Sequence, residues 1–430
     1  MIIFSALSLA AFFLLSLLFF LSIWRKQKKY QFLPPGPAPL PLLGTPKYVG
    51  VHNACKYYPE LHKKFGPIFT VWKLTRPVVV LCGFEVVKDA LVNHGDEFSG
   101  RPFFPVYDRY SGGYNFGRLR RFTIASLRNF GMGKTVMEKR VLEESQSLIQ
   151  AVSQTGGKPF NPITLLACAV ANVTSYALMG EHFYYEDPKL QELIITTRKF
   201  ALISHNPLHE EEHLPGSHFC DNSLIMTVTM LLAAGMETTS STLKFCLVVA
   251  SNYPDVQRKV QQEIDEVTES QRPPGIMDRA QMPYTNAVVH EIQRIFDLAP
   301  TAHYHAVTKD TQFRGYTLPK GTIVTPFLTS VLSDPTQWET PNEFNPGHFL
   351  DDKGQFRTRP AFMAFSAGKR ICAGESLARM KLFLLFSALL QNFTFSQPPG
   401  IPHQDCKQLQ QNKSNHHFSQ LCATPRSLSP

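Results

Sequence analysis

The sequence predicts a mainly α-helical fold with a small β region. Long apolar segments with helical periodicity occupy residues 224–251, 284–296 and 375–391. Two short β-branched runs at 66–72 and 77–82 are separated by a polar turn, which is typical of a hairpin. At 430 residues and 43% hydrophobic, the chain is long enough for one large domain or two smaller ones.

Charge and cysteine usage narrow the class of protein. The net charge of +9 is spread along the chain and favours an acidic protein partner or an anionic membrane surface. No nucleic-acid motif is present, so we expect no nucleic-acid partner. The eight cysteines are scattered without a C-x-x-C pair, which indicates reduced thiols in a cytosol-facing protein.

The N-terminus predicts a membrane anchor. Residues 1–24 are uncharged and strongly apolar, and a basic cluster follows at 25–29. At about 1.5 Å per residue this stretch crosses a hydrocarbon core of roughly 30 Å. A cleaved signal peptide is the alternative, but the charged segment before it and the small-residue cleavage site are missing. We expect a transmembrane signal anchor over 1–24 and a basic, proline-rich linker over 25–37, with the rest of the chain in the cytosol.

The remaining elements follow from local patterns. A helix is predicted to begin at Pro254, with proline in its first turn and an apolar face formed by Val256, Val260, Ile264 and Val267. Residues 321–327 resemble a strand that meets Pro326, which predicts a sheet edge. The apolar segment 375–391 is either a second membrane span or a buried core helix, and its charged residues favour the core helix.

Near the C-terminal end, Cys372 lies in the segment Phe365-Ser-Ala-Gly368-Lys-Arg370-Ile-Cys372-Ala-Gly374, directly before that core helix. The glycines allow backbone amides to approach the sulfur, and a helix N-terminus favours negative charge. This setting suits a thiolate held against a metal or an electrophile. The alternative is an inert buried cysteine that precedes a helix.

The pattern Phe-x-x-Gly-x-Arg-x-Cys-x-Gly resembles the haem-ligand loop of the cytochrome P-450 monooxygenases, with all its fixed positions present. The resemblance implies the cytochrome P-450 fold and haem b, with Cys372 as the axial metal ligand. It also implies Phe365, Gly368 and Arg370 as cofactor-binding residues. A thiolate ligand favours O–O cleavage over oxygen storage.

A second motif, Ala234-Gly235-Met236-Glu237-Thr238-Thr239, interrupts the predicted helix 224–251. An acid and hydroxyls in an apolar helix are costly unless they are paired or used. The motif resembles the oxygen-binding groove of the family, in which the Ala-Gly pair leaves room for dioxygen. The resemblance implies Thr238 and Glu237 as catalytic residues that relay protons, and Ala234 as a cofactor contact. A core helix bent by Ser and Thr is the alternative.

Glu291 and Arg294 are three residues apart on the predicted helix 284–296, so they share a face and can form an ion pair. With the segment 344–349 between them and Cys372, they resemble the Glu-x-x-Arg helix and meander of the family. Here their role is structural. His348 stands where many members have arginine.

Haem propionates need cations or donors. The resemblance assigns this role to Arg101, Arg120, His305 and Arg370. Each of them is otherwise an ordinary surface charge.

Electrons must come from another protein, because no G-x-G-x-x-G or other flavin or nicotinamide site is present. The resemblance implies a flavoprotein reductase that passes on electrons from NADPH, with cytochrome b5 as a further partner. We expect basic residues near the cysteine loop to attract the reductase: Arg118, Arg120, Arg121, Arg128 and Lys369. The expected substrate is a lipophilic small molecule, such as a fatty acid, a steroid or a foreign compound.

The similarity is strongest to the vertebrate microsomal family 2, and we expect the haem-thiolate catalytic domain to span 38–395. Three breaks interrupt it. Phe116 replaces a tryptophan of the family, and a short stretch before it is missing. The chain passes from Ile194 to His218 through barely two dozen residues, where the family has two long helices that form the roof of the substrate pocket. After residue 395, the Gln- and Asn-rich stretch 396–430 shows no apolar period and is expected to be a divergent, disordered tail.

Two hypotheses remain open. The first is a monooxygenase in the endoplasmic reticulum membrane that inserts one atom of dioxygen into its substrate. The second is a non-catalytic, shortened family member, from splicing or a gene-model error, that binds haem poorly or not at all. A thiolate-haem isomerase or dehydratase is a third reading, which the Glu237 and Thr238 motif disfavours.

Overall fold

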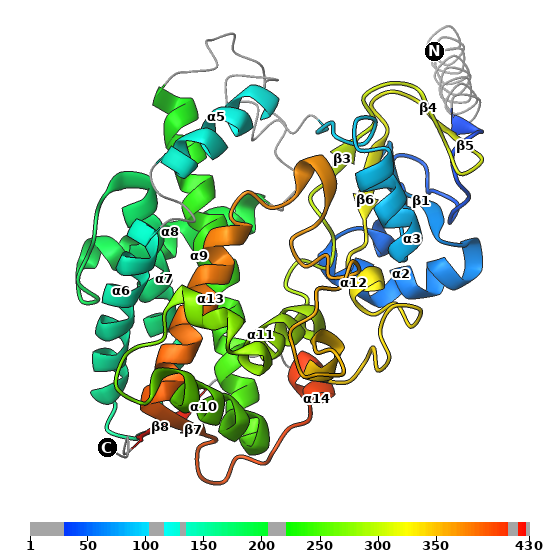
Figure 1. Ribbon diagram of the computed structural model, residues 1–430. Helices are drawn as coiled ribbons and strands as arrows, with labels where there is room; N and C mark the ends of the chain where they lie inside the picture. Colours follow the sequence, from blue (N-terminus) through cyan, green and yellow to red (C-terminus); the bar gives the residue numbers. More distant parts are fainter. Residues whose placement is uncertain (1–29, 103–115, 130–134, 205–220, 412–419, 427–430) are drawn as a thin grey trace, which may run out of the picture. The chain divides into compact units, whose positions relative to one another are not determined.

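This computed structural model describes residues 30–102, 116–129, 135–204, 221–411 and 420–426 (Figure 1). The chain divides into two compact units. The first contains residues up to 102 and 301–327, and the second contains residues 103–300 and 328–430. The predicted anchor over 1–24 and the first part of the linker, 25–29, lie outside the described residues.

A four-stranded sheet of order β1-β2-β6-β3 organises the first unit. The predicted hairpin is confirmed, because β1 (Ile68–Lys73) pairs antiparallel with β2 (Arg76–Leu81). Helix α2 (Val51–Phe65) packs on β1 and buries Tyr58 against Phe69, with ring centroids 5.5 Å apart. The other elements of this unit are η1 (Pro46–Tyr48), α3 (Phe84–Lys88), η2 (Asp89–Asn93) and the hairpin of β4 (Thr311–Phe313) and β5 (Tyr316–Leu318).

The prediction of a sheet edge at Pro326 is wrong. Strand β6 (Ile323–Pro326) lies inside the sheet, parallel to β2 on one side and antiparallel to β3 (His305–Ala306) on the other. The proline is tolerated because β3 pairs only with Ile323 and Val324, so the missing N–H falls at the strand end. The Pro326 carbonyl still accepts a hydrogen bond from the Ala302 amide at 3.0 Å.

The second unit is mostly helical. Its long helices are α5 (Phe116–Asn129), α6 (Thr135–Ser153), α7 (Pro162–Met179), α8 (Pro188–Ser204), α9 (Asp221–Asn252), α10 (Pro254–Thr268), α11 (Pro283–Phe296) and α13 (Glu375–Asn392). Short elements are η3 (Ile276–Ala280), α12 (Thr329–Leu332), η4 (Pro346–Phe349), η5 (Gly368–Arg370), α14 (Cys406–Gln411), β7 (Phe393–Ser396) and β8 (Cys422–Pro425). The helices predicted at 224–251, from Pro254, at 284–296 and at 375–391 are confirmed.

Helix α9 packs against α7, α8, α11 and α13 (Figure 1). Its central segment places Leu232, Ala233 and Met236 in the core, where each is at most 5% exposed. Helix α13 is also a core helix, with Leu384, Leu385 and Leu389 fully buried. The choice of a core helix over a second membrane span is therefore confirmed.

Within the described residues, one helix is long and apolar enough to cross a membrane. This helix is α7, and 67% of it is buried inside the protein. Such burial is typical of a core helix.

The prediction of a disordered tail is wrong for residues 397–411 and 420–426. Strand β8 pairs antiparallel with β7, and Leu421 and Ala423 are buried. Residues 404 and 406 are held by two contacts: Asn252, the last residue of α9, accepts from the Gln404 amide, and the hydroxyl of the next residue, Tyr253, accepts from the Cys406 amide, each at 2.9 Å. A four-residue strand is too short for its apolar period to stand out among polar residues.

Candidate functional site

The cysteine loop is a folded turn directly before α13. The Cys372 amide donates to the Phe365 carbonyl at 2.9 Å, which closes the segment between them. Gly368 opens η5 with φ +67°, a conformation that favours glycine. Ser366 also has a positive φ, +62°, and its buried hydroxyl has no partner among the described residues. The loop therefore holds a tight, strained turn that presents Cys372.

Opposing effects act on the Cys372 thiol. The residue is exposed on one face, yet protein atoms pack around the sulfur, and this burial raises the pKa of the thiol. The amides of Gly374 and Glu375 donate to the sulfur, and with the Arg120 charge they lower the pKa. Burial has the larger effect. A cation that bonds directly to the sulfur would favour the thiolate, as metal ions do for cysteine ligands.

Two guanidinium groups flank this loop. Arg120 on α5 donates to the Ile371 carbonyl, so the structure brings α5 next to Cys372. Burial and the Arg120 charge both lower the pKa of Arg370. Two half-buried like charges repel each other, and an anion beside both relieves this repulsion. Carboxylates such as haem propionates fit this position.

A fully buried ion network, which we call the lock, joins α11 to the segment 332–348 of the same unit. Arg294 donates to both carboxylate oxygens of Glu291 at 2.7 Å, and the His348 ring lies 3.2 Å from the same carboxylate. Arg294 also donates to the carbonyls of Leu332, Pro341 and Glu343. The predicted Glu291–Arg294 ion pair is confirmed, and His348 occupies the third position of the network.

The groove motif lies on a continuous α9. Ala234 and Thr238 are one turn apart and both exposed, whereas Met236 and Thr239 on the other side are 2% exposed. The Thr238 hydroxyl donates to the Ala234 carbonyl at 2.8 Å. A small side chain and a hydroxyl thus lie exposed on one face of α9, and we call this pair the notch. Such a notch fits a flat cofactor and a small ligand above it.

The acid of the motif is paired. Glu237 forms an ion pair with Arg198 of α8 at 3.2 Å, with 44% and 35% of their side chains exposed. Sequence reasoning missed Arg198, because it lies 39 residues away on another helix. This ion pair explains how α9 tolerates a carboxylate among apolar residues.

Arg101 and His305 lie together in the first unit. Arg101 donates to the carbonyls of His303 and Tyr304 at 3.1 and 2.7 Å, and Gly100 forms a bridge with Ala306. His305 is 2% exposed, and its Nδ1 donates to the Phe98 carbonyl at 2.7 Å. Its Nε2 therefore donates to an anion only when the ring carries a second proton.

Sequence reasoning also missed Lys381 on α13 as a site residue. The side chain is 1% exposed and donates to the Gly235 carbonyl of the groove motif. A charged residue in the middle of an apolar helix was the available signal.

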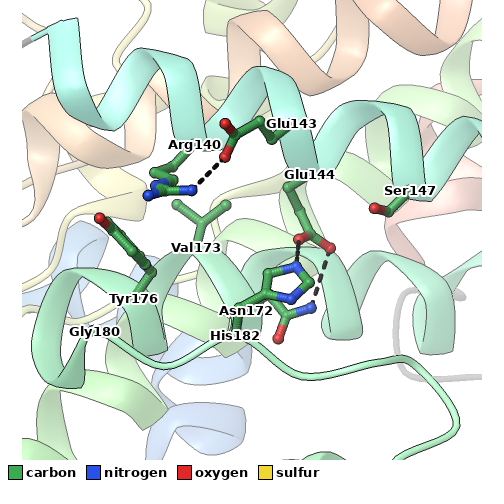
Figure 2. A pocket seen from close by; sticks show the side chains of 9 residues that line it. All are labelled: Arg140, Glu143, Glu144, Ser147, Asn172, Val173, Tyr176, Gly180 and His182. Atoms are coloured by element: carbon green, nitrogen blue, oxygen red, sulfur yellow. Dashed lines mark hydrogen bonds and ion pairs between the residues drawn. The ribbon is translucent and has the colours of Figure 1, made fainter.

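A separate cavity of about 440 Å³ lies on α6, α7 and the loop after α7 (Figure 2). Glu144 at its base is 2% exposed and accepts hydrogen bonds from Asn172, Tyr185 and His182. These contacts attach the loop to α6. None of the predicted site residues lines this cavity.

Comparisons with known proteins agree with this geometry. A family model described as "Cytochrome P450" matches residues 34–210 and 196–418. The chain is 40% identical to cytochrome P450 2C11 of Rattus norvegicus over 446 positions, which cover 88% of this chain and 89% of the relative. It is 39% identical to cytochrome P450 2C8 of Homo sapiens, covering 88% of this chain and 91% of the relative.

These matches also show that relatives are longer than this chain in places. The family model matches in two pieces that overlap at residues 196–210, inside the stretch 194–218 where the sequence predicts a shortened pocket roof. The aligned length of 446 positions exceeds the part of this chain that it covers, so the rat relative has segments without a counterpart here. The thiol, the paired guanidinium groups and the notch fit a haem with a cysteine thiolate ligand. The chain belongs to the cytochrome P450 family, with relatives in its family 2, and is a haem-thiolate monooxygenase.

Proposed function

We propose that this protein inserts one atom of dioxygen into a lipophilic small molecule, such as a fatty acid, a steroid or a foreign compound. The observation that carries the proposal is that one helical unit contains both an exposed thiol, Cys372, and the exposed notch of Ala234 and Thr238. When bound, haem with a thiolate ligand supplies the activation of dioxygen.

The chain's own residues would hold the cofactor. Cys372 would be the iron ligand, oriented by the amides of Gly374 and Glu375. Arg120 and Arg370 would neutralise propionate groups beside the loop, and Phe365 and Gly368 would shape the loop against the ring. Arg101 and His305 are the further candidates for propionate binding.

Thr238 and Glu237 would move protons. The Thr238 hydroxyl donates its hydrogen bond to the Ala234 carbonyl, so its lone pairs are free to accept a hydrogen bond from water. Rotation about its side-chain bond redirects the hydroxyl into the notch. Glu237 is partly exposed and held by Arg198, so it connects the motif to solvent.

Electrons would come from NADPH through a flavoprotein reductase, with cytochrome b5 as a second donor. Three basic side chains near the loop are exposed, Arg121, Arg128 and Lys369, which favours an acidic partner. The apolar residues 1–24 and the basic cluster after them favour anchoring in the endoplasmic reticulum membrane, with the catalytic domain in the cytosol.

The non-catalytic alternative lacks comparable support. A non-catalytic family member would not need to retain both the closed cysteine loop and the exposed notch. The similarity to full-length relatives also extends through both motifs.

The test is reconstitution of the full-length, haem-loaded protein with NADPH and microsomal reductase in phospholipid vesicles. A panel of fatty acids, steroids and drug-like compounds is incubated under ¹⁸O₂. We expect at least one product that carries a single ¹⁸O atom and depends on NADPH. Haem incorporation without any labelled product across the panel would contradict the proposed reaction.

A further inference from the structure

Lys381 is a buried lysine that no step of the proposed reaction uses. It lies on α13, nine positions after Cys372, and only 1% of its surface is exposed. Lysine is rarely buried to this degree unless it is paired or has a function. No carboxylate within the described part of the chain forms a hydrogen bond with its amine.

The amine instead joins two other helices. Its Nζ atom donates to the Gly235 carbonyl of α9 and to the Thr174 hydroxyl of α7, each at 3.1 Å. Thr174 can accept this bond because its own hydrogen goes to the Val170 carbonyl at 2.6 Å. Lys381 therefore connects α13, α9 and α7 at one point.

The helices meet closely at this point. A Cβ atom on Gly235 would lie only 3.2 Å from Cγ2 of Thr174, so the neighbouring helix would have to give way by a few tenths of an ångström. In an α-helix, the Gly235 carbonyl also accepts from the amide of Thr239, one residue after the catalytic hydroxyl. The lysine thus bonds to the backbone turn that carries the notch.

The two hydrogen bonds that Lys381 donates match the two N–H groups of a neutral amine. Burial lowers the pKa of Lys381 to about 7, and the Cys372 thiolate opposes this effect. A neutral amine has two N–H groups, and the two acceptors described above use both of them. Lys381 can therefore serve this junction without a buried, unpaired positive charge.

We propose that Lys381 is a positioning residue of the groove, which ties the Gly235 carbonyl to Thr174 and thereby fixes the α9 turn that carries Ala234 and Thr238. The importance of Lys381 for oxygen chemistry rests on the proposed function. The two hydrogen bonds that it makes, which we call the tie, do not depend on that function. The side chain acts through the α9 backbone and touches no reacting atom.

Hydrogen–deuterium exchange of the full-length, haem-loaded protein tests the tie. In Lys381→Met, which keeps the apolar volume, we expect amides of residues 235–241 to exchange roughly fivefold faster, as after loss of one ordinary hydrogen bond. Lys381→Gln keeps a donor on a side chain one bond shorter and should restore part of the protection. Lys244→Met, which replaces a half-buried lysine of α9, is the matched control and should leave these amides unchanged.

Thr174→Val provides a second route that leaves the lysine in place. It removes one acceptor at nearly constant volume, and we expect a smaller increase in exchange at the same amides. Unchanged exchange in both Lys381→Met and Thr174→Val would overturn the proposal. So would an equal increase in Lys244→Met.

A carbon monoxide difference spectrum of the same samples separates this proposal from the proposed function. A thiolate-type band in every sample, with faster exchange in Lys381→Met, supports both. A missing band in the unsubstituted chain contradicts the proposed function, while the exchange difference would still support the tie.

Discussion

Two ion pairs of the second unit differ in their exposure to solvent and in the number of their partners. In the lock, the side chains of Glu291 and Arg294 are 0% and 1% exposed, and His348 and three carbonyls complete the network. In the groove, Glu237 meets Arg198 through one contact, and their side chains are 44% and 35% exposed. The lock is closed to solvent and satisfied on every side. The groove pair remains in contact with water, which the proton transfer that we propose for Glu237 requires.

The largest effect on the free energy of unfolding is expected for substitutions in the lock. Glu291→Gln removes one buried charge and leaves Arg294 uncompensated, which should lower the free energy of unfolding by roughly 3–5 kcal/mol. Glu237→Gln should change it by less than about 1 kcal/mol, because exposed ion pairs contribute little. Urea unfolding measures both. Equal losses would remove the distinction between the two pairs.

A large effect on activity, with little on stability, is expected at the notch. Thr238→Ala removes the hydroxyl proposed to relay protons, so product formed per NADPH should fall roughly 10²-fold. Thr229→Ala is the matched control, because Thr229 makes the same type of bond to the Ile225 carbonyl on the same helix. A similar loss in both variants would assign the effect to helix packing.

The buried amine of Lys381 should make the free energy of unfolding depend on pH. Its pKa is about 7 in the folded protein, whereas an unfolded lysine titrates near its ordinary value of 10.5. Between these values the unfolded chain binds the extra proton, so the free energy of unfolding should rise with pH. The slope is at most about 1.4 kcal/mol per pH unit. Lys381→Met should lack this contribution, and urea midpoints at pH 7, 8 and 9 compare the two chains. If the stability of both chains changed equally with pH, the lowered pKa of the buried amine would be contradicted.

The smallest effect is expected on the surface of α10. Arg258 pairs with Asp255, and their side chains are 73% and 84% exposed. Arg258→Ala should change the free energy of unfolding by no more than about 0.5 kcal/mol. A loss comparable to that of Glu291→Gln would mean that exposure does not govern the contribution of ion pairs in this protein.

Local patterns were enough to predict the hairpin of β1 and β2, the helices α9, α10, α11 and α13, and the Glu291–Arg294 pair. Each depends on residues that are close in sequence. The cysteine loop and the groove motif were found in the same way, since each lies within one short segment.

The features that sequence reasoning missed depend on distant partners. Arg198 acquires a role only because α8 packs on α9, and Lys381 only because α13 meets α7 and α9. Pro326 fits inside a sheet because its neighbour β3 is only two residues long. Gln404 and Cys406 of the tail are held by Asn252, the last residue of α9, and by Tyr253, the residue after it. Periodicity within one segment reports none of these contacts.

The central claim is that this shortened chain still builds a thiolate site around Cys372. The most direct measurement is the carbon monoxide difference spectrum of the reduced, haem-loaded protein beside Cys372→Ala. We predict the strongly red-shifted band of a thiolate-ligated haem in the unsubstituted chain and its loss in the variant. No band, or the less shifted band of a lost thiolate in the unsubstituted chain, would contradict the account.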